Sequence, residues 1–254
     1  MSEPLTLMAV HAHPDDEASS GGILAAYADQ GIRTVVVTCT NGEYGDAPGG
    51  IKPGQPGHDP DAVARQRLAE LDQSVKILKV SDLEKLGYHD SGMEEWDYKS
   101  RPEAFSNVPI ATVAGRIADL ITKYRPQVLV TYDDQGAYQH PDHVHASLAA
   151  QAAAKETGIP AKVYLSTMKT SNWGKIFAAL RAAGEEVPDW QEDEERGRHE
   201  RLAALGERVG IGAVQFRDGG GYAIVGHQAV MPRFVAPRTG RSPGPGCRSC
   251  RPPG

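Results

Sequence analysis

The chain has 254 residues, of which 40% are hydrophobic, and a formal net charge of −6 at pH 7. This length allows one sizeable α/β domain, and the acidic balance argues against nucleic acid as a partner, because nucleic-acid binders carry basic stripes. The apolar runs are too short to span a bilayer, the polar N-terminus lacks a secretory pattern, and three cysteines do not make a disulfide framework. We therefore expect a cytoplasmic protein without a membrane or nucleic-acid partner.

Short apolar runs alternate with segments of helical spacing along most of the chain. In chain order, the sequence predicts a strand at Leu5–Val10, a helix at Ala18–Gln30, a strand at Thr34–Thr38, a long Gly- and Pro-rich loop at Asn41–Pro60, a helix at Asp61–Val80, a strand at Leu83–Tyr88, a helix at Val108–Tyr124, a strand at Gln127–Tyr132, a helix at Pro141–Thr157, a strand at Val163–Thr167 and a helix at Asn172–Ala183. This alternation predicts an α/β fold with a Rossmann-like parallel sheet and helices on both faces.

Two clusters of polar residues follow strands of this predicted sheet. His11-Ala12-His13-Pro14-Asp15-Asp16-Glu17 follows the first strand, and Tyr138-Gln139-His140-Pro141-Asp142-His143-Val144-His145 comes shortly after the strand at Gln127–Tyr132. Ligands of parallel sheets bind outside the carboxyl ends of the strands. If both strands are central, the two clusters converge at that edge although they lie far apart in the sequence.

Such a convergence would supply the groups of a catalytic zinc site. Two histidines and one carboxylate make three protein ligands and leave the fourth position for water. A further carboxylate can accept a proton, a further histidine can donate one, and a phenol such as that of Tyr138 can donate to an oxyanion. The alternative is that Asp15, Asp16 and Asp142 only cap helices. Two His-Pro-Asp clusters, each between a strand and a helix, favour the metal site.

The same motifs resemble those of a known enzyme family. His13-Pro14-Asp15-Asp16-Glu17 and His140-Pro141-Asp142-His143 resemble the two signatures of the LmbE-like (PIG-L) N-deacetylases. Three further segments match the family as well, and they are Thr40-Asn41-Gly42-Glu43, Arg67-Leu68-Ala69-Glu70-Leu71 and Leu86-Gly87-Tyr88-His89-Asp90-Ser91-Gly92-Met93. The resemblance runs from about Leu5 to Thr167 and is strongest to the actinobacterial deacetylases and amidases of mycothiol metabolism.

The resemblance implies a metal centre and a general base. His13, Asp16 and His143 would bind Zn²⁺, although such a site also suits Fe²⁺ or Co²⁺. Asp15 would take the proton from the attacking water.

The resemblance also implies roles for five other residues. His140 would act as general acid or oxyanion stabiliser, with its ring oriented by Asp142, and Tyr138 would reach the oxyanion. Arg67 and Asp90 would contact sugar or inositol hydroxyls, although a helix salt bridge is an equal alternative for Arg67. We expect His11 and His145 to be structural, because the resemblance gives them no role.

The last quarter of the chain differs from the rest. Residues 191–254 contain no Lys, 10 Arg and 12 of the 28 Gly, and they show no resemblance to the family. We therefore divide the chain into a deacetylase domain at 1–190 and an Arg-, Gly- and Pro-rich segment at 191–254. Two interpretations of this segment are open, which are a diverged lid or substrate region and the product of a late frame shift. The Cys247-Arg248-Ser249-Cys250 motif has no second pair to complete a zinc site.

The leading hypothesis is a zinc-dependent hydrolase that removes an acyl group, acetyl in the first instance, from the amide nitrogen of an N-acyl sugar or related small molecule. One alternative is an amidase of larger mycothiol-type conjugates, and another is a catalytically silent binding protein of the same fold. A nucleotide-binding oxidoreductase would need G-x-G-x-x-G after the first strand, where this chain has the cluster that begins at His11.

Overall fold

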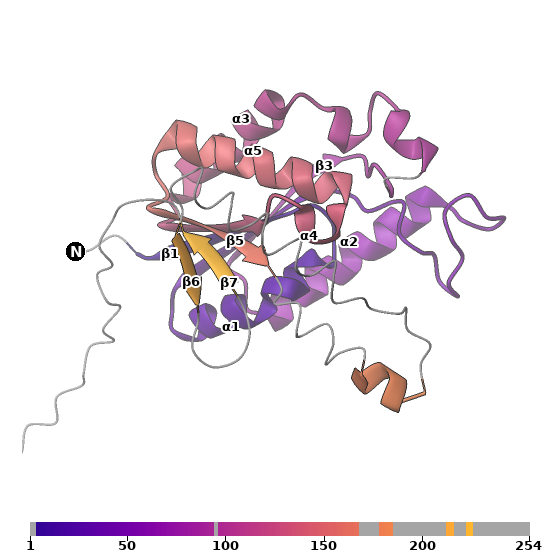
Figure 1. Cartoon of the computed structure of the whole chain (residues 1–254), viewed down its shortest axis with the longest axis horizontal. Helices are drawn as coiled ribbons and strands as arrows, with labels where there is room; N and C mark the ends of the chain where they lie inside the picture. Colours follow the sequence, from indigo (N-terminus) through magenta and orange to yellow (C-terminus); the bar gives the residue numbers. More distant parts are fainter. Residues whose placement is uncertain (1–3, 94–95, 168–177, 185–211, 216–221, 226–254) are drawn as a thin grey trace, which may run out of the picture.

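The computed structural model of the chain describes residues 4–93, 96–167, 178–184, 212–215 and 222–225. Its centre is a sheet with the strand order β3-β2-β1-β4-β5-β7-β6 (Figure 1). The strands are β1 (Thr6–His11), β2 (Arg33–Thr40), β3 (Asp82–Tyr88), β4 (Val128–Tyr132), β5 (Lys162–Thr167), β6 (Gly212–Gln215) and β7 (Tyr222–Val225). Strands β1 to β5 are parallel, which confirms the predicted parallel α/β sheet.

Two antiparallel strands extend the sheet beyond its predicted edge. β7 pairs with β5 and β6 pairs with β7, both antiparallel. Both lie within the segment 191–254, where the sequence analysis assigned no element. The division of the chain at residue 190 stays a prediction.

The helices follow the predicted order. The helix predicted at Pro141–Thr157 has those bounds, the other predicted helices have at least one shifted end, and the short helix Gly136–Gln139 was not predicted. The helices are α1 (Gly21–Asp29), α2 (Pro60–Ile77), α3 (Ile110–Tyr124), α4 (Gly136–Gln139) and α5 (Pro141–Thr157), with 3-10 turns η1 (Asp16–Ser20), η2 (Asp97–Ser100) and η3 (Phe105–Asn107). α1 starts later than predicted because η1 precedes it. Of the helix predicted at Asn172–Ala183, residues 178–182 are helical, and 172–177 lie outside the described residues.

Side chains on both faces of the sheet are buried, because successive strand residues point to opposite sides and helices cover both sides. On one face, Met8, Val10 and Val35 pack in a cluster with α3 and α5. On the other face, Ala9 and Val36 belong to a second cluster. In Figure 1, α3 and α5 cover one side of the sheet and α1 and α2 the other. This burial explains why the strands read as continuous apolar runs rather than as alternating patterns.

Local signals fix where two of the helices begin. Asp59 caps α2 by accepting hydrogen bonds from the backbone N–H groups of Asp61 and Ala62, and Pro60 occupies the first turn, where a missing N–H costs nothing. α5 begins in the same way with Pro141, and its cap is His140, whose ring nitrogen accepts from the N–H of Asp142.

The topology brings the two polar clusters together. The chain builds β1, β2 and β3 toward one edge, and then β4 and β5 on the other side of β1. The switch point of the sheet therefore lies between β1 and β4, and this is where ligands bind in open α/β sheets. The loop after β1 carries the first cluster, and the loop after β4 leads to the second. Among the described helices, none has the length and apolar content that a membrane crossing requires.

Two isoleucines provide a matched test of this packing. Ile117 on α3 is fully buried, whereas Ile77 at the end of α2 is 79% exposed. We expect Ile117→Ala to lower the free energy of unfolding by about 2–5 kcal/mol because it leaves a cavity, and Ile77→Ala to change it by at most about 0.5 kcal/mol. Urea unfolding followed by circular dichroism would measure both. Equal losses in the two variants would contradict the assigned core.

Candidate metal centre

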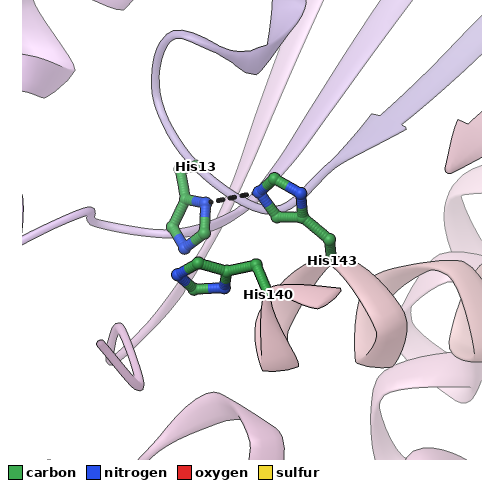
Figure 2. Close-up of side chains that lie close together, drawn as sticks. All are labelled: His13, His140 and His143. Atoms are coloured by element: carbon green, nitrogen blue, oxygen red, sulfur yellow. Dashed lines mark hydrogen bonds between the residues drawn. The ribbon is translucent and has the colours of Figure 1, made fainter. Parts of the chain in front are cut away.

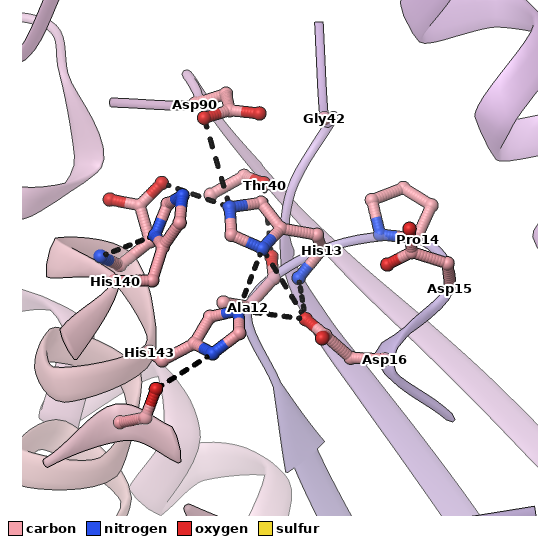
Figure 3. A network of polar contacts seen from close by, with 12 residues as sticks. Ala12, His13, Pro14, Asp15, Asp16, Thr40, Gly42, Asp90, His140 and His143 are labelled. Carbon is pink, nitrogen blue, oxygen red and sulfur yellow. Dashed lines mark hydrogen bonds and ion pairs between the residues drawn. The ribbon is translucent and has the colours of Figure 1, made fainter. Parts of the chain in front are cut away.

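In the loop after β1, the side chains of the neighbouring residues Asp15 and Asp16 point in different directions. Asp16 turns back toward His13, whose backbone N–H donates to Asp16 Oδ2 over 2.8 Å. Asp15 has φ 122°, which is rare for a residue with a side chain, and its side chain lies beside Pro14 instead (Figure 3). The side chain of Asp15 makes no capping hydrogen bond to the turn that follows. Helix capping therefore does not explain Asp15.

His143 lies in the first turn of α5 and contacts the loop that follows β4. Gly136 has φ 55°, and a Cβ atom there would lie 2.8 Å from the His143 side chain, so the loop requires glycine at this position. The Gly136 carbonyl accepts a hydrogen bond from His143 Nδ1 over 3.1 Å. This contact places the ring proton on Nδ1 and leaves the lone pair of Nε2 free.

Three donor atoms from the two clusters then form a small triangle. His13 Nδ1 lies 3.1 Å from His143 Nε2 and 3.3 Å from Asp16 Oδ2, and the third side, between His143 Nε2 and Asp16 Oδ2, is 3.5 Å. Atoms bound to zinc at 2.0–2.1 Å in a tetrahedron lie about 3.3 Å apart. The spacing and chemistry of the three donors therefore fit a tetrahedral metal ion.

A third imidazole, that of His140, lies close to this triangle. Its ring centroid lies 4.6 Å from that of His13 and 4.9 Å from that of His143 (Figure 2). These three histidines can approach a common metal ion. However, His140 Nδ1 accepts the N–H of Asp142 over 3.2 Å, so its neutral form carries the ring proton on Nε2. His140 is thus suited to donate a hydrogen bond to a ligand.

The second nitrogen of His13 faces two carboxylates. His13 Nε2 lies 3.2 Å from Asp142 Oδ2 and 3.7 Å from Asp90 Oδ1, and Asp142 Oδ2 also accepts the N–H of Ser91 over 2.9 Å. Such carboxylates orient a metal-binding imidazole and raise its basicity. His13, Asp90 and Asp142 also form the other described group that could hold a metal ion.

This placement differs from the predicted role of Asp142. Its carboxylate was expected to orient the ring of His140. Within the described part of the chain, that carboxylate has hydrogen bonds to His13 and Ser91, and Asp142 reaches His140 only through its backbone N–H. The reason is that His140 caps α5, which turns its Nδ1 to the helix end and away from the Asp142 side chain.

Tyr132 is a site residue that the sequence analysis missed. Its hydroxyl donates to Asp16 Oδ2 over 2.6 Å and accepts the N–H of Ala12 over 2.7 Å, and its ring stacks on His143 at 4.3 Å between centroids. Tyrosine is a common strand residue, so nothing in the sequence separates Tyr132 from the rest of β4. It holds the carboxylate of Asp16 in the triangle.

Charge controls the protonation of the donors. Burial lowers the pKa of His13, but the carboxylates of Asp90, Asp142 and Asp16 outweigh burial and raise the pKa well above its usual range. Burial would raise the pKa of Asp16, but His13 and His143 lower it instead. These shifts favour a protonated imidazole at His13 beside an ionised carboxylate at Asp16.

The pKa values of His143 and His140 are lowered. Burial, with smaller contributions from His13 and His140, lowers the pKa of His143 to about 4. Burial and the nearby His13 also lower the pKa of His140. At neutral pH, His143 therefore offers a free lone pair to a metal ion.

The other predicted residues lie around this centre. The Tyr138 side chain is 58% exposed and stands edge-on to the rings of His140 and His143. The guanidinium of Arg67 donates hydrogen bonds to the Gly42 and Pro14 carbonyls and to the carboxylate of Asp15.

Two histidines of the clusters stay outside the donor triangle. His11 is 1% exposed and packs edge-on against the ring of Tyr132. His145 is 8% exposed and packs edge-on against Phe105.

A model of the PIG-L family, described as GlcNAc-PI de-N-acetylase, matches residues 8–154. This span is more than half of the chain and contains both His-Pro-Asp clusters. The chain belongs to the PIG-L family.

Two curated relatives of this PIG-L chain carry the same description, 1D-myo-inositol 2-acetamido-2-deoxy-alpha-D-glucopyranoside deacetylase. The protein from Acidothermus cellulolyticus is 38% identical over 189 residues, which are 71% of this chain and 64% of that protein. The protein from Streptomyces avermitilis is 39% identical over 195 residues, which are 70% of this chain and 66% of that protein. The chain thus spans just under two thirds of the length of these relatives.

Two solved structures share the fold. N,N′-diacetylchitobiose deacetylase from Pyrococcus horikoshii has a TM-score of 0.52 at 19% identity, over 87% of this chain and 84% of that chain. GalB, the 4-carboxy-2-hydroxymuconate hydratase from Pseudomonas putida, has a TM-score of 0.53 at 20% identity, over 91% of this chain and 100% of that chain. One of these proteins is named a deacetylase and the other a hydratase, so the shared fold does not determine the reaction.

Metal affinity tests whether the carboxylate of Asp142 supports His13 as a metal ligand. We expect Asp142→Asn to weaken metal binding about 10- to 100-fold, because an amide neither raises the basicity of His13 nor balances its charge. Competition with a chromogenic chelator would measure the affinity. The surface variant Asp72→Asn, whose carboxylate pairs with Lys85, is the control. Wild-type affinity in Asp142→Asn would contradict a supporting role for this carboxylate.

The raised pKa of His13 predicts how metal affinity depends on pH. Below that pKa the metal must displace a proton from His13, so the apparent affinity should rise about tenfold for each pH unit. Once the pH exceeds that pKa, His13 is already deprotonated and the increase should level off. Chelator competition at pH 6, 7 and 8 would show the slope. A constant affinity over this range would mean that no such proton is displaced.

Proposed function

We propose that the chain is a metal-dependent hydrolase that removes an acyl group, acetyl in the first instance, from the amide nitrogen of an N-acylated sugar or related small molecule. The observation that carries the proposal is the triangle of His13, Asp16 and His143 donors, which fits zinc, at the switch point of the sheet. The two relatives from Acidothermus cellulolyticus and Streptomyces avermitilis are described as deacetylases of an acetamido sugar, which supports this substrate class.

Three residues would hold the metal ion, and we propose Zn²⁺, although Fe²⁺ or Co²⁺ suits the same donors. His13 and His143 offer ring nitrogens and Asp16 offers a carboxylate oxygen. A zinc ion in this position supplies a Lewis acid that polarises an amide carbonyl and makes water nucleophilic at neutral pH. Tyr132 keeps Asp16 Oδ2 aimed at the triangle through its 2.6 Å hydrogen bond.

Asp15 is the proposed general base. Asp16 is tied to His13 and Tyr132. The Asp15 side chain, whose Oδ2 accepts a hydrogen bond from Arg67, is 71% exposed. A carboxylate beside the metal centre can accept the proton of the attacking water and return it to the departing amine.

His140 and Tyr138 are the proposed donors to the oxyanion. The neutral ring of His140 presents an N–H at Nε2, because its Nδ1 accepts the N–H of Asp142. The Tyr138 hydroxyl stays protonated, since burial raises its pKa above the usual value. Donors on the same side of the metal as the carbonyl oxygen would stabilise the negative charge that develops there. Asp90 is the proposed contact to substrate hydroxyls on the Nε2 side of His13.

Metal content and turnover test the proposal together. Protein purified without added metal or chelator should contain about one zinc or iron per chain, and the His13→Ala/His143→Ala variant should contain none. Asp15→Asn should keep the metal and lose about 10²- to 10⁴-fold in kcat, because the base is absent. Turnover would be followed as amine release from N-acetylglucosamine, N,N′-diacetylchitobiose and the acetamido-glucosyl inositol of the named relatives.

The outcomes separate the alternatives. A metal-loaded wild type that hydrolyses only larger amide conjugates would replace the sugar deacetylase with an amidase. A metal-loaded protein that is inactive on every amide would indicate a binding protein of the same fold. Wild-type turnover in Asp15→Asn would make the assignment of the base wrong.

A further inference from the structure

A surface cavity lies beside the proposed general base. It has a volume of about 340 Å³, and Asp15 is one of the residues that line it. The rest of its lining comes from α2 and from the loop after β2. Pockets that bind small ligands have volumes from about 300 Å³ upward. The cavity is therefore large enough for one ring of a small-molecule substrate.

One face of α2 forms the first wall of the cavity. The residues of α2 that line it are Val63, Gln66, Arg67 and Glu70. Residues at this three- and four-residue spacing lie on the same side of a helix. Val63 is 2% exposed and contributes an apolar surface, whereas Gln66 and Glu70 are exposed. Gln66 Nε2 donates to Glu70 Oε1 over 2.9 Å, so the two polar side chains support each other.

The loop after β2 forms the second wall. Gly45 and Asp46 line the cavity from this loop. A Cβ atom at Gly45 would lie 2.8 Å from Arg67 NH1, so a larger residue would push the loop away from the helix. The ring nitrogen Nε2 of His58 lies 2.9 Å from the Gly45 carbonyl oxygen. The loop is thus held close to α2 by contacts within the protein.

The charge of the lining indicates what kind of group the cavity accepts. Three carboxylates, those of Asp15, Asp46 and Glu70, face one guanidinium, that of Arg67, among the described lining residues. Lys52 pairs with Asp46 over 2.6 Å at the surface, and an excess of negative charge still remains. Such a lining repels phosphate and carboxylate groups. Carboxylate oxygens accept hydrogen bonds from hydroxyl groups, so a neutral ring with several hydroxyls fits this lining.

We propose that this cavity is the subsite for a second, polyhydroxylated ring, which is joined to the acetamido sugar whose amide is cleaved. Asp46 and Glu70 determine specificity for that ring, because their carboxylates accept its hydroxyl protons. The inference rests on the proposed function and extends it, since Asp15 lines the cavity and is also the proposed base beside the metal centre.

Two amide variants of nearly equal size test the carboxylates. We expect Asp46→Asn and Glu70→Gln each to change one ratio, that of kcat/KM for the acetamido-glucosyl inositol to kcat/KM for N-acetylglucosamine. The ratio should fall about tenfold, because hydrogen bonds to a charged acceptor are the stronger ones. Asp72→Asn is the matched control, since Asp72 lies on the same helix outside the cavity and pairs with Lys85. Metal content and Tm should match wild type in all three variants.

A large side chain tests the space itself. Gln66 is exposed on α2, so Gln66→Trp should fold as wild type does and fill the cavity. The same ratio should then fall about tenfold or more, because the second ring loses the volume that it needs. Gln73→Trp is the matched control, since Gln73 is exposed on the same helix but does not line this cavity.

Free ligands identify the chemical class that the cavity accepts. myo-Inositol should inhibit hydrolysis of the acetamido-glucosyl inositol competitively, and its inhibition constant should rise about tenfold in Glu70→Gln. Inositol phosphate should inhibit more weakly, because the carboxylates of the lining repel it. Choline, a cation of similar size, should also inhibit more weakly, since it offers a single hydroxyl group.

Several results would overturn the inference. An unchanged ratio in Gln66→Trp, or an equal fall in Asp72→Asn, would mean that the cavity does not hold the second ring. Stronger inhibition by inositol phosphate or by choline than by myo-inositol would make it an anion or a cation site. Failure of the proposed function looks different, because wild type would then be inactive on every amide, N-acetylglucosamine included.

Discussion

The candidate metal centre depends on the imidazole of His13, whose two nitrogens have different partners. His13 Nδ1 faces Asp16 and His143 at 3.1–3.3 Å, while His13 Nε2 faces the carboxylate of Asp142 at 3.2 Å. A hydrogen bond from Nε2 to a carboxylate fixes the tautomer and leaves Nδ1 free for a metal ion. The rest of the site follows from this arrangement, because β1 must deliver His13 to the point where α5 delivers Asp142 and His143.

The sequence allowed this convergence to be predicted because its signals are local. Apolar runs mark the strands, and polar clusters directly after two of them mark the carboxyl edge of a parallel sheet. The strand order, with β4 beside β1, then brings His13 to His143 across 130 positions of the chain. Pro141 likewise indicated the start of α5, because proline is common in the first turn of a helix.

The parts that escaped prediction depend on contacts between distant residues. Tyr132 looks like any strand tyrosine until the fold places its hydroxyl 2.6 Å from Asp16. Asp142 looked like a partner of its neighbour His140, but that ring caps α5 and the carboxylate turns to His13. The side chains of Asp15 and Asp16 point in different directions because Asp15 has a φ of 122°. A strained backbone of this kind cannot be predicted from a residue pattern. β6 and β7 were also missed, because short strands of four residues leave little periodicity to detect.

The balance of buried charge favours the binding of a metal ion at this site. Three carboxylates, those of Asp16, Asp90 and Asp142, lie within 3.2–3.7 Å of the ring nitrogens of His13, and the side chains of Asp90 and Asp142 are 4% and 0% exposed. Buried carboxylates that lack sufficient positive charge destabilise a fold. In the metal-free protein, the proton on His13 provides only one positive charge. A divalent ion bound at Nδ1 would replace this proton and raise the positive charge from one to two, while keeping the hydrogen bond of Nε2 and using the lone pair that Gly136 leaves free on His143. The same carboxylates that make the empty site costly therefore make it selective for a cation of higher charge than a proton.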